Sequence, residues 1–368
     1  MTDKYKEIRP FNDNEVEEAI KRLIHDDEFT DAIIKYRFPR LSNSFGWLLK
    51  PIICRFLQKK WSKVQTVRDV QLAVAAYMDN MIKTSTDGVS YSGIDNLDPN
   101  QSYVFISNHR DIAMDPAFVN WGLHTSGRDT LRIAIGDNLL KKPCATELMK
   151  LNKSFIVNRS ATAPREMLKA LTQLSGYIKS SLDEHQSIWI AQREGRAKDG
   201  DDKTEPAILK MLFVNGKREK IPFSEYMQSL NIVPVSISYE DDPCDIAKAQ
   251  ELYQKSQTGS YDKSEFEDIE SIISGITGYK GKVHVSFGDA IKDEFETPED
   301  LALEIDRQIT NNYQLYANNF IAAKVESDIV TDSKRVAFNN KLAALEPGVA
   351  EIVRKMYAYP VLKQQDNN

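Results

Sequence analysis

Short apolar, β-branched runs alternate with longer segments of helical spacing from about residue 87 onward. This alternation predicts strands followed by helices, and therefore an α/β fold with a mixed, largely parallel sheet and helices on both faces. We expect strands at 89–94, 103–107, 131–135, 154–160, 187–191, 232–238 and 282–288. The last of these alternates in period 2, which is typical of an edge strand.

Helical patterns without strands flank this part of the chain. We predict an N-terminal helical region over 1–86, an α/β domain over 87–330 and a C-terminal helical tail over 331–368. Helices are expected at 10–33 and 298–326, and Thr66 with Asp69 can cap a further helix. A polar excursion at 240–280 shows no strand pattern.

The window 34–63 differs in charge from its surroundings. It contains no Asp or Glu, although its basic residues are numerous, and apolar residues recur at helical spacing around Pro51, which should start or kink the helix. The apolar positions are Phe45, Leu48, Leu49, Ile52, Ile53, Phe56 and Leu57. This pattern predicts an interfacial helix on an anionic membrane surface. The alternative is a helix that packs on the body with its Lys and Arg in solvent.

Composition narrows the class of protein. The 368 residues are 41% hydrophobic and 28% charged, as in a globular protein, and the net charge of −6 does not suggest a nucleic-acid partner. Three widely spaced Cys exclude a disulfide framework and a Cys-based zinc site, and favour a reducing compartment. The N-terminus is unlike a signal peptide, and no window is apolar enough for a transmembrane span. We expect a cytoplasmic protein, associated peripherally with the inner face of the membrane.

Three predicted strands end in polar clusters. His109 follows the second strand, with Asp111 and Asp115 just beyond it, and Arg159 ends the strand at 154–160. The third cluster comprises Arg193, Glu194, Gly195, Arg196 and Lys198. Because strand ends in open α/β sheets meet at one edge, these side chains can converge. A His with an Asp partner is a general base, and Arg binds phosphate bidentately. The pattern indicates a His base acting on a substrate held by its phosphate, with no metal required.

The order of these motifs resembles the glycerolipid acyltransferases, which include glycerol-3-phosphate and 1-acylglycerol-3-phosphate acyltransferases. The family's Asn-His-x4-Asp motif is similar to Asn108-His109 with Asp115. The second motif, Phe-Ile-x-Arg, resembles the segment that ends at Arg159, and the third, Glu-Gly-x-Arg, resembles the segment that begins at Glu194. The fourth, an apolar strand around a Pro, is matched at 232–235.

Two spacings depart from the family pattern. Five residues, not four, separate His109 from Asp115, so Asp111 is an alternative partner for His109. The third motif is one residue short, so Arg196, Lys198 or Arg193 could occupy the phosphate-binding place.

The resemblance implies an O-acyltransferase that moves a fatty acyl group from a thioester to a hydroxyl of a phosphate-bearing glycerolipid precursor. The first choice of acceptor is 1-acylglycerol-3-phosphate (lysophosphatidic acid), and glycerol-3-phosphate is the alternative. The acyl donor, acyl-CoA or acyl-carrier protein, is a co-substrate, and no other cofactor is implied. The rival from another class is a non-catalytic phospholipid or acyl-carrier binding protein on the same scaffold.

Overall fold

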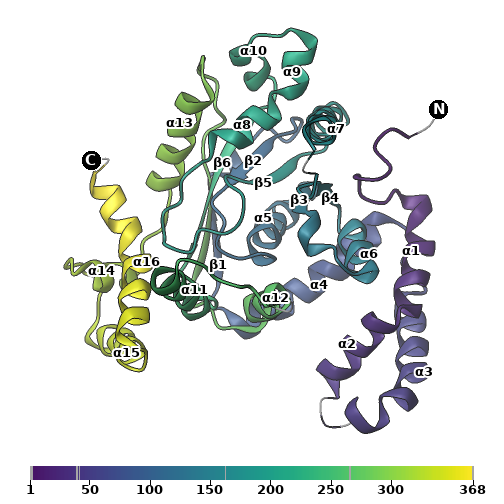
Figure 1. Ribbon diagram of the computed structural model, residues 1–368, viewed down its shortest axis with the longest axis horizontal. Coiled ribbons are helices and arrows are strands. Elements are labelled where there is room, and N and C mark those ends of the chain that lie inside the picture. The colour runs from purple at the N-terminus through teal and green to yellow at the C-terminus, as the bar shows by residue number, and fades with distance from the viewer. Residues whose placement is uncertain (1–2, 39, 41, 162, 265–266, 367–368) are drawn as a thin grey trace. The chain divides into compact units, whose positions relative to one another are not determined.

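The computed structural model describes residues 3–366, apart from 39, 41, 162 and 265–266. The chain divides into two compact units, shown as a ribbon in Figure 1. The first unit comprises Met1–Tyr77 and Leu131–Tyr177, and the second comprises Met78–Thr130 and Ile178–Asn368. The sequence-based boundary between residues 86 and 87 is not one of the boundaries between these units.

The first unit consists of helices around a parallel pair of strands, β3 and β4. Its elements are α1 (Asp13–His25), α2 (Asp27–Arg37), α3 (Ser42–Trp61), β3 (Arg132–Gly136), η2 (Asp137–Leu139), α6 (Pro143–Leu151) and β4 (Ser154–Val157). The greater part of α7 (Pro164–Asp183) and the first half of α4 (Val67–Ser85) also belong to it. An apolar cluster that includes Val16, Leu23, Ile34 and Leu57 forms its core.

The predicted helix over 10–33 is two helices in the structure. The first ends at His25 because Asp26 adopts an extended backbone and caps the second, accepting a hydrogen bond from the Phe29 N–H at 2.9 Å. In α3, Pro51 lies inside the helix and does not start it. The predicted cap of α4 is present, because the Thr66 hydroxyl accepts from the Asp69 N–H at 3.1 Å.

The second unit contains five strands in the order β1-β7-β6-β2-β5. They are β1 (Val89–Ser92), β2 (Val104–Ser107), β5 (Ile188–Ala191), β6 (Ile232–Tyr239) and β7 (Val283–Phe287). The pairs β1–β7, β2–β6 and β2–β5 are parallel, and β6–β7 is antiparallel. With the parallel pair in the first unit, the strands confirm the predicted mixed, largely parallel α/β class.

The prediction that 282–288 is an edge strand is wrong. β7 pairs with β1 on one side and β6 on the other, so β1 is the outer strand. The alternation has another cause, because the polar face of β7 meets polar residues of β1. His284 lies between Ser90, 2.8 Å from Nδ1, and Ser92, 2.9 Å from Nε2. The period therefore marks a hydrogen-bonded polar face inside the sheet.

Helices account for the rest of the second unit. They are η1 (Ile94–Asn96), α5 (Met114–Thr125), α8 (Pro206–Leu212), α9 (Val214–Glu219), α10 (Phe223–Gln228), α11 (Asp245–Thr258), α12 (Glu267–Thr277), α13 (Pro298–Asn311), α14 (Ala317–Ala323), α15 (Asp332–Ala343) and α16 (Pro347–Asp366). The predicted polar excursion is thus the helix pair α11 and α12. The helix expected over 298–326 ends at Asn311, and α14 follows it. Residues 367–368 of the predicted tail lie outside the described residues.

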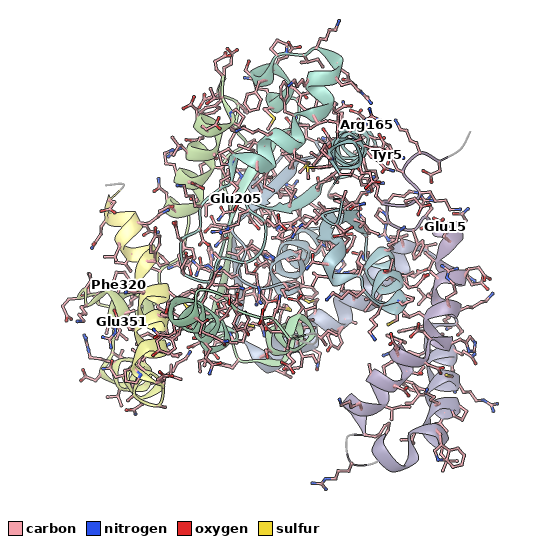
Figure 2. All side chains as sticks on the ribbon, in the orientation of Figure 1. Tyr5, Glu15, Arg165, Glu205, Phe320 and Glu351 are labelled. Carbon is pink, nitrogen blue, oxygen red and sulfur yellow. The ribbon has the colours of Figure 1, made fainter. Side chains whose placement is uncertain are left out.

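The last helices form a core of their own. α14 and α11 both pack against α16. Figure 2 labels Phe320 on α14 and Glu351 on α16. Phe338, Val353 and Tyr357 are buried in this cluster. α11 is therefore held by packing against the C-terminal helices. Across the described part of the chain, every helix is too short or too polar to cross a membrane.

Gly93 is a tight point of the second unit, and its replacement tests the packing at the end of β7. Its φ is +74°, and a Cβ there would lie 1.9 Å from the Phe287 carbonyl oxygen. Gly259 has a similar φ of +78°, but nothing lies within 4 Å of its Cβ position. Gly259→Ala should cost about 1 to 2 kcal/mol, the left-handed backbone penalty alone. Gly93→Ala should cost roughly 1 to 3 kcal/mol more, because the backbone must shift.

Urea unfolding of both variants measures the difference. Equal losses of unfolding free energy would contradict the close approach of Gly93 and Phe287.

Candidate active site

His109 lies just beyond the carboxyl end of β2. All four residues of β2 are buried, and the strand lies between β5 and β6. The Asn108 side chain ties the end of β2 to β6. Its Oδ1 accepts from the Ile237 N–H at 2.8 Å, and its Nδ2 donates to the Ile237 carbonyl at 3.0 Å. β2 is thus paired with a strand on each side, and Asn108 adds a side-chain link to β6, so the backbone just before His109 is held in place.

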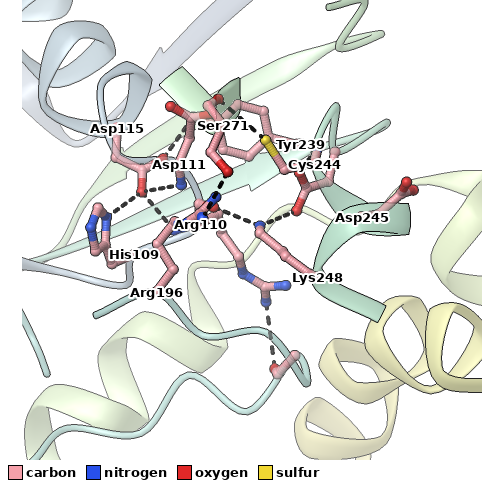
Figure 3. A network of polar contacts seen from close by, with 12 residues as sticks. His109, Arg110, Asp111, Asp115, Arg196, Tyr239, Cys244, Asp245, Lys248 and Ser271 are labelled. Atoms are coloured by element: carbon pink, nitrogen blue, oxygen red, sulfur yellow. Dashed lines mark hydrogen bonds and ion pairs between the residues drawn. The ribbon is translucent and has the colours of Figure 1, made fainter. Parts of the chain in front are cut away.

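His109 contacts Asp115, the second residue of α5. Nδ1 of His109 lies 2.9 Å from Oδ2 of Asp115, which is fully buried (Figure 3). The same oxygen accepts from the backbone N–H of Arg110 at 2.6 Å and of Asp111 at 2.9 Å. The other oxygen, Oδ1, accepts from the Tyr239 hydroxyl at 2.6 Å. Four donors thus hold one carboxylate.

Tyr239 was not among the residues singled out from the sequence. It is the last residue of β6, so the rule that polar strand ends gather at one edge would have found it had it been applied to a fourth strand. Burial, followed by the charge of Asp115, raises the pKa of Tyr239 well above its usual value. The phenol therefore stays protonated and remains a donor to Asp115.

Asp111 has a different role from Asp115. Its Oδ1 accepts from the N–H groups of Ala113 at 3.0 Å and Met114 at 2.8 Å, so it caps the start of α5. Its Oδ2 faces Gly275 of α12, where an added Cβ would lie 2.1 Å away. Burial, and then the charge of Asp115, raises the pKa of Asp111 to about 6. Of the two partners that the spacing left open, Asp115 is the one that contacts His109.

The third polar cluster lies beside His109. The Ala197 N–H donates to the His109 carbonyl at 2.9 Å, which places Arg196 and Lys198 on either side of that contact. Gly195 has a φ of +74°, a left-handed conformation that favours glycine. Arg196 Nη2 donates to the Ser271 hydroxyl at 3.2 Å, and its Nη1 is buried without a hydrogen-bond partner among the described residues.

The other cations of the cluster are paired with carboxylates. Lys198 forms an ion pair with Glu251 of α11. Arg193 Nε lies 3.8 Å from Glu205 Oε1. Glu194 is exposed.

Arg159 belongs to the first unit, at 131–177, whereas the other predicted site residues belong to the second. Its backbone N–H donates to Asp137 Oδ1 at 3.2 Å, just beyond β4. A part for Arg159 beside His109 therefore stays a prediction.

The sequence patterns also gave no indication of several buried charged residues near the backbone of His109. Arg110 Nη2 lies 2.6 Å from Asp202 Oδ2. Lys248 of α11 donates to the Arg110 carbonyl at 2.6 Å and pairs with Asp242 at 2.5 Å. Lys248 lies in a polar helical segment whose sequence contains no motif, so no signal pointed to it. These groups brace the backbone next to His109.

One group of potential metal ligands occurs in the first unit. Asp26, Glu28 and Cys144 bring three ligand atoms within 4.8 Å of one another. None of these residues belongs to the cluster around His109.

Comparison with known proteins gives one family match and a similar solved structure. Residues 88–238 match the family model described as Acyltransferase, and this confirms the resemblance seen in the motifs. The chain is also similar to the crystal structure of the 1-acyl-sn-glycerophosphate (LPA) acyltransferase PlsC from Thermotoga maritima. The identity is 14% and the TM-score 0.38, with 80% of this chain and 94% of that chain covered. The search of curated proteins gave no match.

The raised pKa of Asp111 predicts a pH-dependent stability. The pKa is about 6 in the folded protein, against an ordinary value of 3.8 for an Asp side chain, so the folded state binds more protons between these values. Ionisation of Asp111 therefore lowers the unfolding free energy as pH rises from about 4 to 6, by up to roughly 3 kcal/mol. Asp111→Asn should remove this loss.

Urea unfolding of both proteins at pH 4.5 and 7.5 checks this expectation. The variant's stability relative to the wild type should be greater at pH 7.5 than at pH 4.5. The same relative stability at both values would contradict the raised pKa.

Proposed function

We propose that the protein is an O-acyltransferase that moves a fatty acyl group from a CoA or acyl-carrier-protein thioester to a hydroxyl of a phosphate-bearing glycerolipid precursor. The most suitable acceptor is 1-acylglycerol-3-phosphate. The observation that carries the proposal is the contact of His109 Nδ1 with the buried carboxylate of Asp115, inside the segment that matches the acyltransferase family.

The geometry suits a general base. With Nδ1–H donated to Asp115, Nε2 is the ring nitrogen that can accept a proton. His109 takes the proton of the acceptor hydroxyl as its oxygen attacks the thioester carbonyl. Asp115 stabilises the imidazolium that results. The tetrahedral intermediate then collapses, the C–S bond breaks and the proton passes from His109 to the thiolate. The nucleophile comes from the substrate, so no protein Ser is needed.

The acceptor phosphate is assigned to the cations next to His109. Arg196 has a buried nitrogen, Nη1, without a hydrogen-bond partner among the described residues, and this supports a ligand there. A guanidinium can donate two parallel hydrogen bonds to phosphate. Lys198 is a further candidate. Fixing the phosphate would hold the hydroxyl close to His109, an advantage of proximity on the order of 7 kcal/mol or more.

The substrate and the exposed face of α3 both favour a membrane surface. Ile53 and Leu57 bury one face of α3 in the first unit's core. Trp47, Ile52 and Phe56 belong to the other face and are 72%, 62% and 59% exposed. Arg55, Lys59 and Lys60 are exposed around them. The Phe45 side chain lies outside the described residues. An apolar face with basic neighbours fits the boundary of an anionic bilayer, and we assign it to the inner face of the membrane.

Replacement of His109 tests the chemistry. His109→Ala should lower thioester-dependent acylation of 1-acylglycerol-3-phosphate by roughly 10² to 10⁴-fold, because the proton of the hydroxyl has no acceptor. Release of free CoA thiol measures the rate. His124→Ala, at the far end of α5, is the control and should retain activity. An equally active His109→Ala enzyme would contradict the assignment, and a wild-type protein that acylates no phosphate-bearing acceptor would favour the binding-protein alternative.

Sedimentation with phosphatidylglycerol vesicles tests the membrane surface. Ile52→Ser and Phe56→Ser should each weaken binding about tenfold, because each removes apolar area worth roughly 1.4 kcal/mol or more. Leu303→Ser is the matched control, since Leu303 on α13 is 65% exposed. Added salt should also weaken binding. Wild-type protein that stays in solution at low salt would contradict this surface.

A further inference from the structure

Lys198, one of the cations assigned to the acceptor phosphate, already has an anion of the same chain beside it. Glu251 of α11 forms an ion pair with Lys198, and both side chains are largely buried, with 16% and 23% exposed. Glu251 lies on α11, one of the two helices in the segment 240–280 that was expected to be a polar excursion. Lys198 therefore has a carboxylate partner before any substrate anion binds.

α11 presents Glu251 from a fixed position. Asp245, its first residue, accepts from the Tyr357 hydroxyl at 2.7 Å and pairs with Lys341 at 2.5 Å. Lys248, one turn before Glu251, donates to the Arg110 carbonyl at 2.6 Å. Residues three apart share a helix face, so the same face that braces the backbone next to His109 carries Glu251 to Lys198. The helix cannot withdraw Glu251 without losing buried contacts.

We propose that Glu251 is a specificity-determining residue, an internal counter-ion that neutralises Lys198 and limits how strongly the site holds a doubly charged phosphate. The inference rests on the proposed function, in which Lys198 faces the acceptor phosphate. The energy of an anion near Glu251 scales with the anion's own charge. A phosphate monoester carries about −1.5 to −2 at neutral pH, and a diester carries about −1. Glu251 therefore weakens the binding of a monoester more than that of a diester.

The counter-ion also has a consequence for turnover. Acceptor and product carry the same phosphate, so a site with the full charge of both Arg196 and Lys198 would retain the product as well as the acceptor. Neutralising Lys198 leaves two cations of this loop with a buried nitrogen that lacks a hydrogen-bond partner among the described residues, Arg196 and Arg193, and Arg193 Nε also lies 3.8 Å from Glu205 Oε1. The site then binds the phosphate with moderate strength and releases it after transfer.

Calorimetric binding of two small probes to the full chain tests the proposal without requiring catalysis. Methyl phosphate represents the monoester, and dimethyl phosphate represents the diester. Glu251→Gln keeps the side chain's shape and removes its charge. It should tighten methyl phosphate binding on the order of tenfold and dimethyl phosphate binding about threefold. Glu270→Gln, exposed on α12, is the control and should leave both affinities unchanged.

A second pair of variants separates the counter-ion from a purely structural role. Lys198→Met alone should weaken methyl phosphate binding about tenfold, because it leaves an unpaired carboxylate that repels the probe. Lys198→Met combined with Glu251→Gln removes a neutral pair, and its affinity should return to within about threefold of the wild type. The KM for 1-acylglycerol-3-phosphate should fall in Glu251→Gln.

The proposal is overturned if Glu251→Gln binds methyl phosphate no more tightly than the wild type does, or if the double variant binds as weakly as Lys198→Met. Failure of the proposed function has a different signature. In that case the wild-type protein transfers no acyl group. The methyl phosphate affinities of the wild type, Glu251→Gln, Lys198→Met and the double variant can still be measured and ranked.

Discussion

The fully buried carboxylate of Asp115 is the interaction on which the rest of the site depends. It accepts from the His109 ring, from two backbone N–H groups and from the Tyr239 hydroxyl. A carboxylate taken out of water is costly unless donors replace its hydration, and these four donors do so. Three of the donors belong to the consecutive residues 109–111 beyond β2, the fourth is Tyr239 of β6, and the carboxylate itself lies on α5, so the charge can be buried only when β2, α5 and β6 are all in place. The contacts that bury Asp115 on folding therefore also orient the His109 ring.

The surrounding groups extend this constraint outward. Asn108 joins β2 to β6, and Asp111 caps the helix that carries Asp115. Lys248 connects the Arg110 carbonyl to α11, which is itself packed on the C-terminal helices. A polar network of this kind is stable only when nearly every member is satisfied. Arg110 Nε, Asp111 Oδ2, Asp202 Oδ1 and Arg196 Nη1 are buried without a hydrogen-bond partner among the described residues, and Arg196 is the one assigned to the proposed acceptor phosphate.

Much of this arrangement is predictable from the sequence, because strands and their polar ends have local signals. The apolar runs locate β2 and β6, and the Pro that follows Asp115 indicates the helix that turns this carboxylate toward His109. The sequence could not show that Lys198 pairs with Glu251, since the two are 53 residues apart and α11 carries no motif. Nor could it show that β7 lies inside the sheet, because a polar ladder with β1 imitates the alternation of an edge strand.

In the proposed mechanism Asp115, and not Asp111, orients His109 as the general base. Acyl transfer from a CoA thioester to 1-acylglycerol-3-phosphate by Asp115→Asn and Asp111→Asn, each shown by circular dichroism to be folded, tests it most directly. Asp115→Asn should lose on the order of 10³ to 10⁴-fold in kcat, because the ring takes the wrong tautomer. Asp111→Asn should stay within about tenfold of the wild type, because an amide oxygen can still cap α5. An active Asp115→Asn enzyme beside an inactive Asp111→Asn enzyme would contradict the assignment of Asp115 as the partner of His109.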